Sequence, residues 1–394
     1  MIYRRFGKTE LSMPALSFGC MRSMHDWQDT ALEKIPAAAN NKLETIVRKA
    51  LGYGINHIET AHGYGSSERQ LGLILAKIPR NDFMLQTKVV PSDDNDEFLN
   101  KILSSMKRLQ VNRLDLLAIH GINDHRTLWQ SCRKNGCLAV ANRLREKGII
   151  DFVGFSGHGP CDVIIDALNH DEDGGFDFFN VHWYYILDAN RKAIELAADR
   201  DIGTFIISPS DKGGYLHTPS AKLVSLCSPL SPMLFNDIYC LRQHGVTTIS
   251  VGASEPEHFD EHLKALSYLQ ENDQELLIQI DNNLSAAVQK CSGSRRPDSL
   301  WNHLPPWEQA PGNINLRMIS WLYNLYRAWD MKQYARDRYA NLGTGSGWVP
   351  GNNGTAAEKM DFSTLQPHGH YCSAEIKELV IKAHGLLSQA DPET

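Results

Sequence analysis

Four side chains suited to acid–base chemistry stand at or just after the ends of three short apolar segments. Glu59 closes the segment that begins at Ile55, and Tyr64 follows five residues later. Lys88 lies near the end of the segment FMLQTKV, and His120 ends the segment LDLLAIH. Each segment has the composition of a β-strand, and α/β folds carry their chemistry at the C-terminal ends of parallel strands. We therefore expect the four groups to meet at one end of a sheet.

These residue types together suit proton transfer to an oxygen atom. A phenol has a pKa near 10, and an adjacent ammonium group lowers that pKa by favouring the phenolate. Lys88 would supply the ammonium, and Glu59 would keep it charged and oriented. His120 would hydrogen-bond a substrate carbonyl or pass a proton to it through the phenol of Tyr64. Such a site would protonate an oxygen while a hydride arrives at carbon.

Apolar and amphipathic stretches alternate along most of the chain, as they do in a parallel sheet with helical crossovers. Ser66 or Ser67 is expected to cap a helix with Glu68 in its first turn, and residues 254–257 have the spacing of a capping box. The expected strands are 15–21, 56–60, 83–89, 114–120, 151–159, 176–185, 203–214 and 247–254, and the expected helices include 42–53, 68–77, 94–109 and 139–147.

The first 270 residues or so resemble the aldo-keto reductase family. The opening YRRFGKTELSMPALSFGCM is similar to that family's N-terminal hairpin and first barrel strand, and Tyr64, Lys88 and His120 match three members of its Asp-Tyr-Lys-His tetrad. Glu59 stands where the family usually has Asp, which lengthens the reach to Lys88 by one methylene. The resemblance implies an α/β fold, a (β/α)8 TIM barrel with an N-terminal β-hairpin, and a catalytic set made of Glu59, Tyr64, Lys88 and His120.

The resemblance also implies a nicotinamide coenzyme, with NADP as the family default. Gly157 replaces a usual Asn, and Ile207 stands where many relatives have an aromatic residue. The loop after the eighth strand offers His and Glu rather than the Lys or Arg that grips a 2′-phosphate, so NAD stays open. The expected cofactor-binding residues are Gly19, Cys20, Met21, Ser156, Asn180, Ser208, Ser210, Lys212, Gly252, Ala253, Ser254, His258 and His262.

Two tryptophans are candidates for the wall of a substrate pocket. Trp27 lies in the long segment after the first strand, and Trp183 belongs to the sixth. Long loops at this face of a barrel tend to shape pockets. Packing against the protein is at least as good an explanation for the presence of Trp27. The sequence of these loops does not identify the substrate.

From residue 273 the pattern changes to a helical C-terminal extension, which gives two predicted domains, 1–272 and 273–394. The extension resembles the ferredoxin-like tail of one aldo-keto reductase subgroup, whose cysteines hold iron–sulfur clusters. Only Cys291 and Cys372 remain here, so we expect no cluster and no other metal. A helix is expected over 316–339, a glycine-rich linker over 343–354 and a last helix over 373–387. We expect this tail to act as a packing element, as a lid, or as the interface of a homodimer.

The composition is that of an ordinary globular protein. With 42% hydrophobic residues and a formal net charge of −6, the chain gives no indication of nucleic-acid binding. It has no apolar run of the roughly 20 residues that span a bilayer and no leader-like N-terminus, so we expect no membrane partner and a cytoplasmic location. The eight cysteines form no CxxC pair and are expected to be free thiols or small buried hydrophobes.

The sequence supports two functions of different class. The first is an NAD(P)-dependent oxidoreductase that reduces an aldehyde or ketone to an alcohol, or runs the reverse oxidation, with Tyr64 as general acid or base and a small molecule as substrate. The second is a catalytically weak nicotinamide-binding regulatory protein on the same barrel, which Glu59, Gly157 and Ile207 favour. Oxidation of a reduced nicotinamide by carbonyl compounds is expected only under the first.

Overall fold

The computed structural model describes residues 1–269, 273–365 and 372–389. The chain forms two compact units, each assembled from several segments. The barrel unit comprises Met1–Tyr184, Asn190–Lys212 and Asn236–Asn272, and the C-terminal unit comprises Tyr185–Ala189, Gly213–Phe235 and Asp273–Thr394. The domain limits inferred from the sequence, 1–272 and 273–394, stay a prediction.

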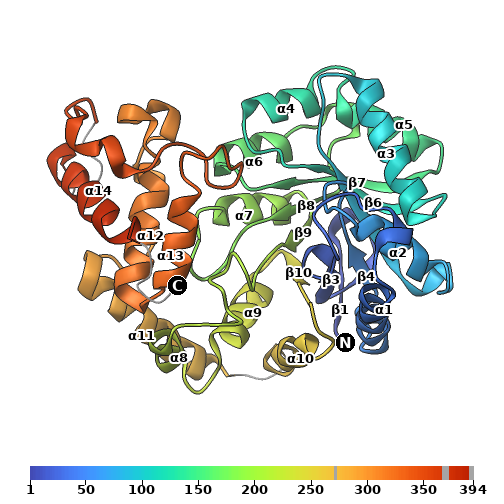
Figure 1. Ribbon diagram of the computed structural model, residues 1–394, viewed down its shortest axis with the longest axis horizontal. Helices are drawn as coiled ribbons and strands as arrows, with labels where there is room; N and C mark the ends of the chain where they lie inside the picture. Colours follow the sequence, from blue (N-terminus) through green and yellow to red (C-terminus); the bar gives the residue numbers. More distant parts are fainter. Residues whose placement is uncertain (270–272, 366–371, 390–394) are drawn as a thin grey trace. The chain divides into compact units, whose positions relative to one another are not determined.

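In the described part of the chain, eight parallel strands close into a barrel in the order β10-β3-β4-β5-β6-β7-β8-β9. A separate antiparallel hairpin pairs β1 with β2 at the N-terminus. This is the predicted (β/α)8 barrel with an N-terminal hairpin (Figure 1). The strands are β1 Tyr3–Arg5, β2 Ser12–Pro14, β3 Leu16–Gly19, β4 His57–Glu59, β5 Met84–Val89, β6 Leu114–His120, β7 Ile150–Gly157, β8 Phe178–Val181, β9 Gly203–Ile206 and β10 Val246–Val251.

Helices connect the strands and continue into the C-terminal region, as predicted. They are α1 Ala37–Gly52, α2 Ser67–Leu75, α3 Asn95–Leu109, α4 His125–Cys132, α5 Cys137–Glu146, α6 Cys161–Leu168, α7 Arg191–Asp199, α8 Ala221–Cys227, α9 Pro232–Arg242, α10 His258–Tyr268, α11 Gln274–Ser292, α12 Leu316–Trp329, α13 Lys332–Ala340 and α14 Ser373–Leu387. No helix in the described ranges is both long and apolar enough to cross a membrane.

Helix α3 illustrates how the sequence specifies these elements. The Asp94 carboxylate accepts hydrogen bonds from the backbone N–H groups of Asp96 and Glu97, which satisfies donors that the first turn leaves free. Phe98 and Ile102 recur at helical spacing and are fully buried. The first turn is thus capped by a side chain while one face of the helix packs in the core.

The barrel interior is layered, because side chains two positions apart on a strand face the same side. Phe178 and Phe205 belong to an apolar cluster that fills one layer, together with Phe6 of the N-terminal segment. A polar group adjoins this layer, since His57 meets Phe205 edge-on at 5.3 Å and its Nδ1 lies 2.8 Å from Ser17 Oγ. Glu59 lies two residues beyond His57 on β4, in the next layer toward the C-terminal strand ends.

The serine cap expected for α2 does not form. Ser66 precedes the helix, but its hydroxyl bonds Gln70 and the backbone of Asp26 instead of a free N–H of the first turn. Ser67 is the first helical residue, and its hydroxyl lies 2.8 Å from Thr60 Oγ1. The hydroxyls of Ser66 and Ser67, which were expected to cap the helix, therefore bond other parts of the fold instead.

The capping box expected over 254–257 is also absent. Helix α10 begins at His258, and the preceding Glu257 makes no capping bond with its side chain. The spacing of Ser254 and Glu257 matched the motif, but the helix begins too late for Glu257 to lie in its first turn. The prediction of a helix start in this region was right, and the prediction of its cap was wrong.

The C-terminal unit is built on aromatic side chains. Trp321 and Trp329 are fully buried and donate their indole N–H groups to the carbonyls of Ile186 and Leu284, which makes them part of its core, as predicted. The helix expected over 316–339 is two helices, because Asp330 adopts the left-handed conformation (φ 57°) and ends α12. The last helix, α14, spans the predicted residues.

Two further predictions about the extension concern its loops and cysteines. The segment 343–354 is not an open linker, since the Gly343 N–H donates to Gly351 and Asn352 forms a bridge with Ile314. Cys291 and Cys372 are both free thiols. Among the described residues, no group of three or more His, Cys, Asp or Glu side chains is placed to hold a metal ion.

Candidate active site

A buried ion pair lies at the centre of the site. Glu59 ends β4 and Lys88 lies near the end of the neighbouring β5, and the two side chains are in direct contact. The Lys88 ammonium also donates to the Thr60 carbonyl at 3.2 Å, and Ser250 Oγ donates to Glu59 Oε2 at 3.5 Å. Burial, together with the nearby charge of Lys212, lowers the pKa of Lys88 to about 7. The Glu59 carboxylate acts in the opposite direction because it favours the ammonium form.

Tyr64 lies beside this pair, in the loop that follows β4. The Lys88 ammonium is 4.8 Å from the centre of the Tyr64 ring, and the His120 ring meets it edge-on at 5.9 Å. Burial raises the pKa of the Tyr64 phenol above its ordinary value, so the lowering expected from Lys88 alone does not prevail. The phenol is therefore protonated at neutral pH and is poised to give a proton rather than to take one.

His120 ends β6 on the other side of Tyr64. Burial, reinforced by the charges of Lys88 and Lys212, lowers the pKa of His120 to about 3. At neutral pH the imidazole carries no charge, and it can donate one hydrogen bond while accepting another. This state suits a hydrogen bond to a carbonyl oxygen better than it suits direct acid catalysis.

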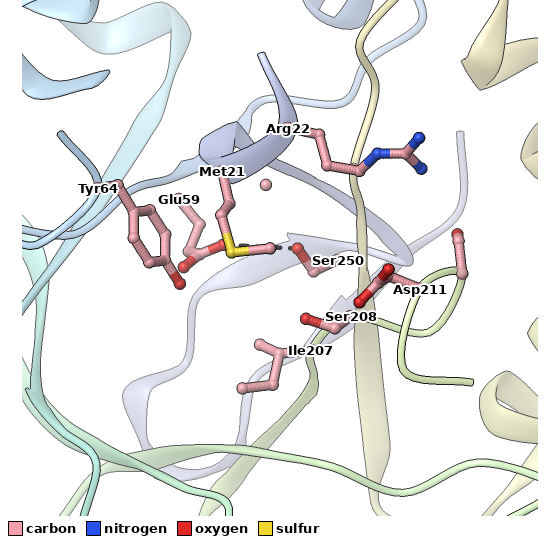
Figure 2. A pocket seen from close by; sticks show the side chains of 11 residues that line it. Met21, Arg22, Glu59, Tyr64, Ile207, Ser208, Asp211 and Ser250 are labelled. Carbon is pink, nitrogen blue, oxygen red and sulfur yellow. Dashed lines mark hydrogen bonds between the residues drawn. The ribbon is translucent and has the colours of Figure 1, made fainter. Parts of the chain in front are cut away.

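A pocket opens next to these groups, at the C-terminal ends of the strands. Figure 2 shows Glu59, Tyr64 and Met21 close together on one side of it, with Ser208 and Asp211 on another. Glu59 and Tyr64 thus both line this pocket. The residues that line the pocket are Gly19, Met21, Arg22, Glu59, Tyr64, Ile207, Ser208, Ser210, Asp211, Ser250 and Gly252.

Asn180 and Ser156 lie side by side on β8 and β7. The Ser156 hydroxyl accepts a hydrogen bond from the Gly121 N–H at 3.0 Å. The Asn180 side chain is fully buried, and neither its oxygen nor its nitrogen has a partner within the described residues. A buried amide with a free donor and a free acceptor indicates a missing polar partner, because burying such groups alone is costly.

The residues expected to bind cofactor divide between the pocket and its surroundings. His262 is fully buried and its Nδ1 lies 2.5 Å from Asp237 Oδ2, so it ties α10 to α9 instead of facing a phosphate. The Ser254 N–H donates to His258 Nδ1 at 3.3 Å, within the same loop. Cys20 and Ala253 are fully buried outside the pocket lining. The predicted residues that do line the pocket are Gly19, Met21, Ser208, Ser210 and Gly252.

Lys212 and the two tryptophans also lie away from the pocket lining. The Lys212 ammonium is directed at His158 and His182. Trp183 is fully buried and stacks on Tyr239 with ring centres 4.7 Å apart, which makes it a core residue. Trp27 is 64% exposed, and its backbone packs over Gly65.

Sequence reasoning missed Arg22, Asp211 and Ser250. Arg22 follows β3 in a short 3₁₀ turn, and its aliphatic stem crosses Gly252, where an added Cβ would lie 3.0 Å from Arg22 Cδ. The sequence argument looked for cations only in the loops after the seventh and eighth strands. Asp211 and Ser250 lie next to predicted residues, and the alternation of strand side chains could have identified Ser250 from its position two residues before Gly252.

Comparison with known proteins gives consistent matches. The sequence profile of the Aldo/keto reductase family matches residues 15–221. An aldo-keto reductase from Mycobacterium sp. strain KMS is 33% identical over 182 residues, which cover 45% of this chain and 62% of that protein. A methylglyoxal reductase from Escherichia coli K12 is 27% identical over 185 residues, again 45% of this chain and 62% of the relative. The chain thus spans less than two thirds of these curated relatives.

Solved structures share the fold. An aldo-keto reductase from Bacillus halodurans in its holo form aligns with a TM-score of 0.58 at 20% identity, over 72% of this chain and 96% of that one. An aldo-keto reductase from Klebsiella pneumoniae in complex with NADPH aligns with a TM-score of 0.57 at 17% identity, over 72% and 95% of the two chains. The profile of the Aldo/keto reductase family covers more than half of the 394 residues of this chain, so the chain belongs to the aldo-keto reductase family.

Proposed function

We propose that this protein reduces an aldehyde or ketone to an alcohol with NADPH or NADH, with Tyr64 as the general acid. The observation that carries the proposal is the meeting of Tyr64 with Lys88 and His120 beside a pocket. The described residues form no hydrogen bond with the Tyr64 hydroxyl, which leaves it available to a carbonyl oxygen. Proximity of an acid to the reacting oxygen is the first requirement for general acid catalysis.

The residues present fit a nicotinamide coenzyme. Among the described residues, the buried Asn180 amide has no acceptor for its N–H group and no donor for its oxygen. The carboxamide group of nicotinamide offers both. Ser210 Oγ is likewise buried without a partner in the described chain, and Ser210 shares the pocket lining with Arg22. Asn180 and Ser156 would hold the carboxamide, while Ser208, Ser210 and Arg22 would face the phosphates. The Klebsiella pneumoniae protein binds NADPH, which supports a nicotinamide coenzyme here.

The chain's own groups would then divide the work as follows. The bound coenzyme would supply hydride to the carbonyl carbon. Tyr64 would donate its phenolic proton to the carbonyl oxygen, and His120 would donate a hydrogen bond that orients the same oxygen. Lys88, kept in place by Glu59, would stabilise the phenolate that remains. The raised pKa of Tyr64 keeps the acid form available, and so it favours the direction of reduction.

The test compares Tyr64→Phe with the unchanged protein. NADPH oxidation is followed with a panel of aldehydes and ketones, and NADPH binding is followed by its fluorescence. We expect Tyr64→Phe to lose about 10²- to 10⁴-fold in turnover, the usual contribution of a general acid, while NADPH binding is retained. Tyr3→Phe, which alters an exposed tyrosine, is the matched control. Undiminished turnover in Tyr64→Phe would remove this residue from the mechanism.

The second candidate is a nicotinamide-binding regulatory protein with weak catalysis. The direct contact of Glu59 with Lys88 favours it, because the carboxylate reduces the electrostatic help that Lys88 gives to a developing phenolate. This candidate predicts that NADPH binds while none of the carbonyl compounds oxidises it. The fluorescence and oxidation measurements described above therefore separate the two functions.

A further inference from the structure

A second cluster of ionisable side chains lies on the strands next to the candidate active site. Lys212 follows β9, and its Nζ lies 3.3 Å from His158 Nδ1 and 3.3 Å from His182 Nε2. The two histidines follow β7 and β8, and their rings meet edge-on with centres 4.1 Å apart. The ends of three successive strands therefore bring one ammonium and two imidazoles together.

The charges of this cluster differ from those of an ordinary ion pair. Burial, with contributions from Lys212 and His120, holds the pKa of His158 well below its ordinary value, so its imidazole is neutral. A neutral imidazole can accept a hydrogen bond from an ammonium group, but it brings no negative charge of its own. His158 therefore directs the Lys212 ammonium through a hydrogen bond.

The cluster lies close to the groups that would perform the reaction. On neighbouring strands His120 pairs with Ser156, two residues before His158, and Ser156 pairs with Asn180, two residues before His182. The charge of Lys212 also lowers the pKa of both Lys88 and His120. Lys212 and His158 are only partly buried. Asp211, the residue before Lys212, lines the pocket itself (Figure 2).

We propose that Lys212, positioned by His158 and His182, binds an anionic group, a carboxylate or a phosphate, at the far end of the carbonyl substrate. This inference rests on the proposed reduction, because Tyr64 and His120 place the carbonyl oxygen. A fixed ammonium beside that oxygen selects substrates that carry a negative charge a few bonds away from the carbonyl. Neutral aldehydes would fit the catalytic groups but would lack this contact.

The test uses pairs of substrates that differ in charge. Succinic semialdehyde is compared with its methyl ester, and glycolaldehyde phosphate with glycolaldehyde, so that a carboxylate and a phosphate are assessed separately. The unchanged protein should prefer at least one anionic member of these pairs, mainly through KM. Lys212→Met should lose about 10- to 100-fold more in kcat/KM for that substrate than for its neutral partner, which is the effect of one charge-assisted hydrogen bond.

Three further variants check the assignment. Lys212→Arg keeps the charge and should restore part of the preference. His158→Leu removes one of the two acceptors and should raise KM more for the anionic substrate than for the neutral one. Lys147→Met, which removes an exposed lysine elsewhere on the barrel, is the control for a nonspecific loss of positive charge.

Binding supplies a readout that does not depend on turnover. Calorimetric titration of succinate and of inorganic phosphate into the NADPH-loaded protein should show weaker binding in Lys212→Met, with the Kd for NADPH unchanged. Equal losses for NADPH and for all substrates would overturn the inference and assign Lys212 to the coenzyme. Absence of any preference for an anion would also overturn it while leaving the proposed reduction standing. If no carbonyl compound is reduced, the proposed reduction fails, and equal anion binding by both proteins would then overturn the anion site.

Discussion

Replacement of Glu59 by Gln tests the ion pair on which the whole site is built. The substitution keeps the shape and a hydrogen-bond acceptor but removes the charge that faces Lys88. Breaking a buried pair by removing one partner leaves an uncompensated charge, which typically costs about 3–5 kcal/mol. Lys88 can escape that cost only by giving up its proton in the folded state.

The pKa of Lys88 sets the pH range of the effect. In the unchanged protein burial lowers this pKa from the ordinary 10.5 to about 7, and removal of the Glu59 charge should lower it further. Each further pKa unit costs about 1.4 kcal/mol of stability at pH values where the unchanged protein carries the ammonium, and the expected loss there is about 3–5 kcal/mol.

The loss should depend on pH in a defined direction. Between the folded pKa of Lys88 and its unfolded value of 10.5, the unfolded chain binds a proton that the folded chain lacks, so stability rises with pH. In the unchanged protein this rise begins near pH 7, and in Glu59→Gln, with its lower folded pKa, it should begin at more acidic pH. The deficit of Glu59→Gln should therefore be largest below about pH 7 and should shrink toward alkaline pH.

Urea unfolding, followed by circular dichroism at several pH values from mildly acidic to alkaline, measures this deficit. Glu59→Asp is the matched control, because it keeps the charge and restores the residue usual in the family. A Glu59→Gln protein as stable as the unchanged one at mildly acidic pH would refute the account of the pair. A deficit of constant size at every pH would refute the assignment of the cost to the Lys88 proton.

Two more outcomes follow from the buried ionisable groups. Reduction catalysed by the unchanged protein should weaken as pH rises through the Lys88 pKa of about 7, because the ammonium that stabilises the phenolate is then lost. His120 with a pKa of about 3 is already neutral and Tyr64 with its raised pKa is still protonated, so a kcat/KM profile that is flat from about pH 5 to pH 9 would contradict this. His262→Leu should destabilise the protein by about 3–5 kcal/mol, since it removes the hydrogen-bond partner of the buried Asp237 carboxylate. Burial raises the pKa of Asp237, so protonation should reduce that deficit as pH falls, which thermal unfolding at acidic and alkaline pH would detect.

The barrel could be predicted from the sequence because its signals are local and repeated. Apolar segments alternate with amphipathic ones, and a chain of that pattern has few arrangements other than a parallel sheet with helical crossovers. The proximity of Lys88 and His120 followed from the same rule, since both stand at strand ends and such ends meet on one face of the barrel. The strand β6 was predicted with the bounds it has, Leu114–His120.

The details beyond the reach of the sequence depend on contacts between distant parts of the chain. The direction of the Tyr64 pKa could not be judged from its neighbours in the chain, because burial by the folded barrel outweighs the single charge of Lys88. Tryptophan and histidine are residue types that suit a pocket, but Trp183 stacks on Tyr239 and His262 bonds Asp237 in the core. No spacing rule in the sequence indicates either contact. Residue type therefore identified candidates, and packing decided which of them face the site.

The charged groups of the site have a common interpretation. Glu59 reaches Lys88 directly, and Lys212 adds a second ammonium held by His158 and His182. Because Glu59 already faces Lys88, an anionic end of the substrate would gain its charge-assisted contact from Lys212. A neutral substrate would gain nothing from that contact. The same polar residues that make the site costly to fold would therefore favour the binding of a negatively charged carbonyl compound.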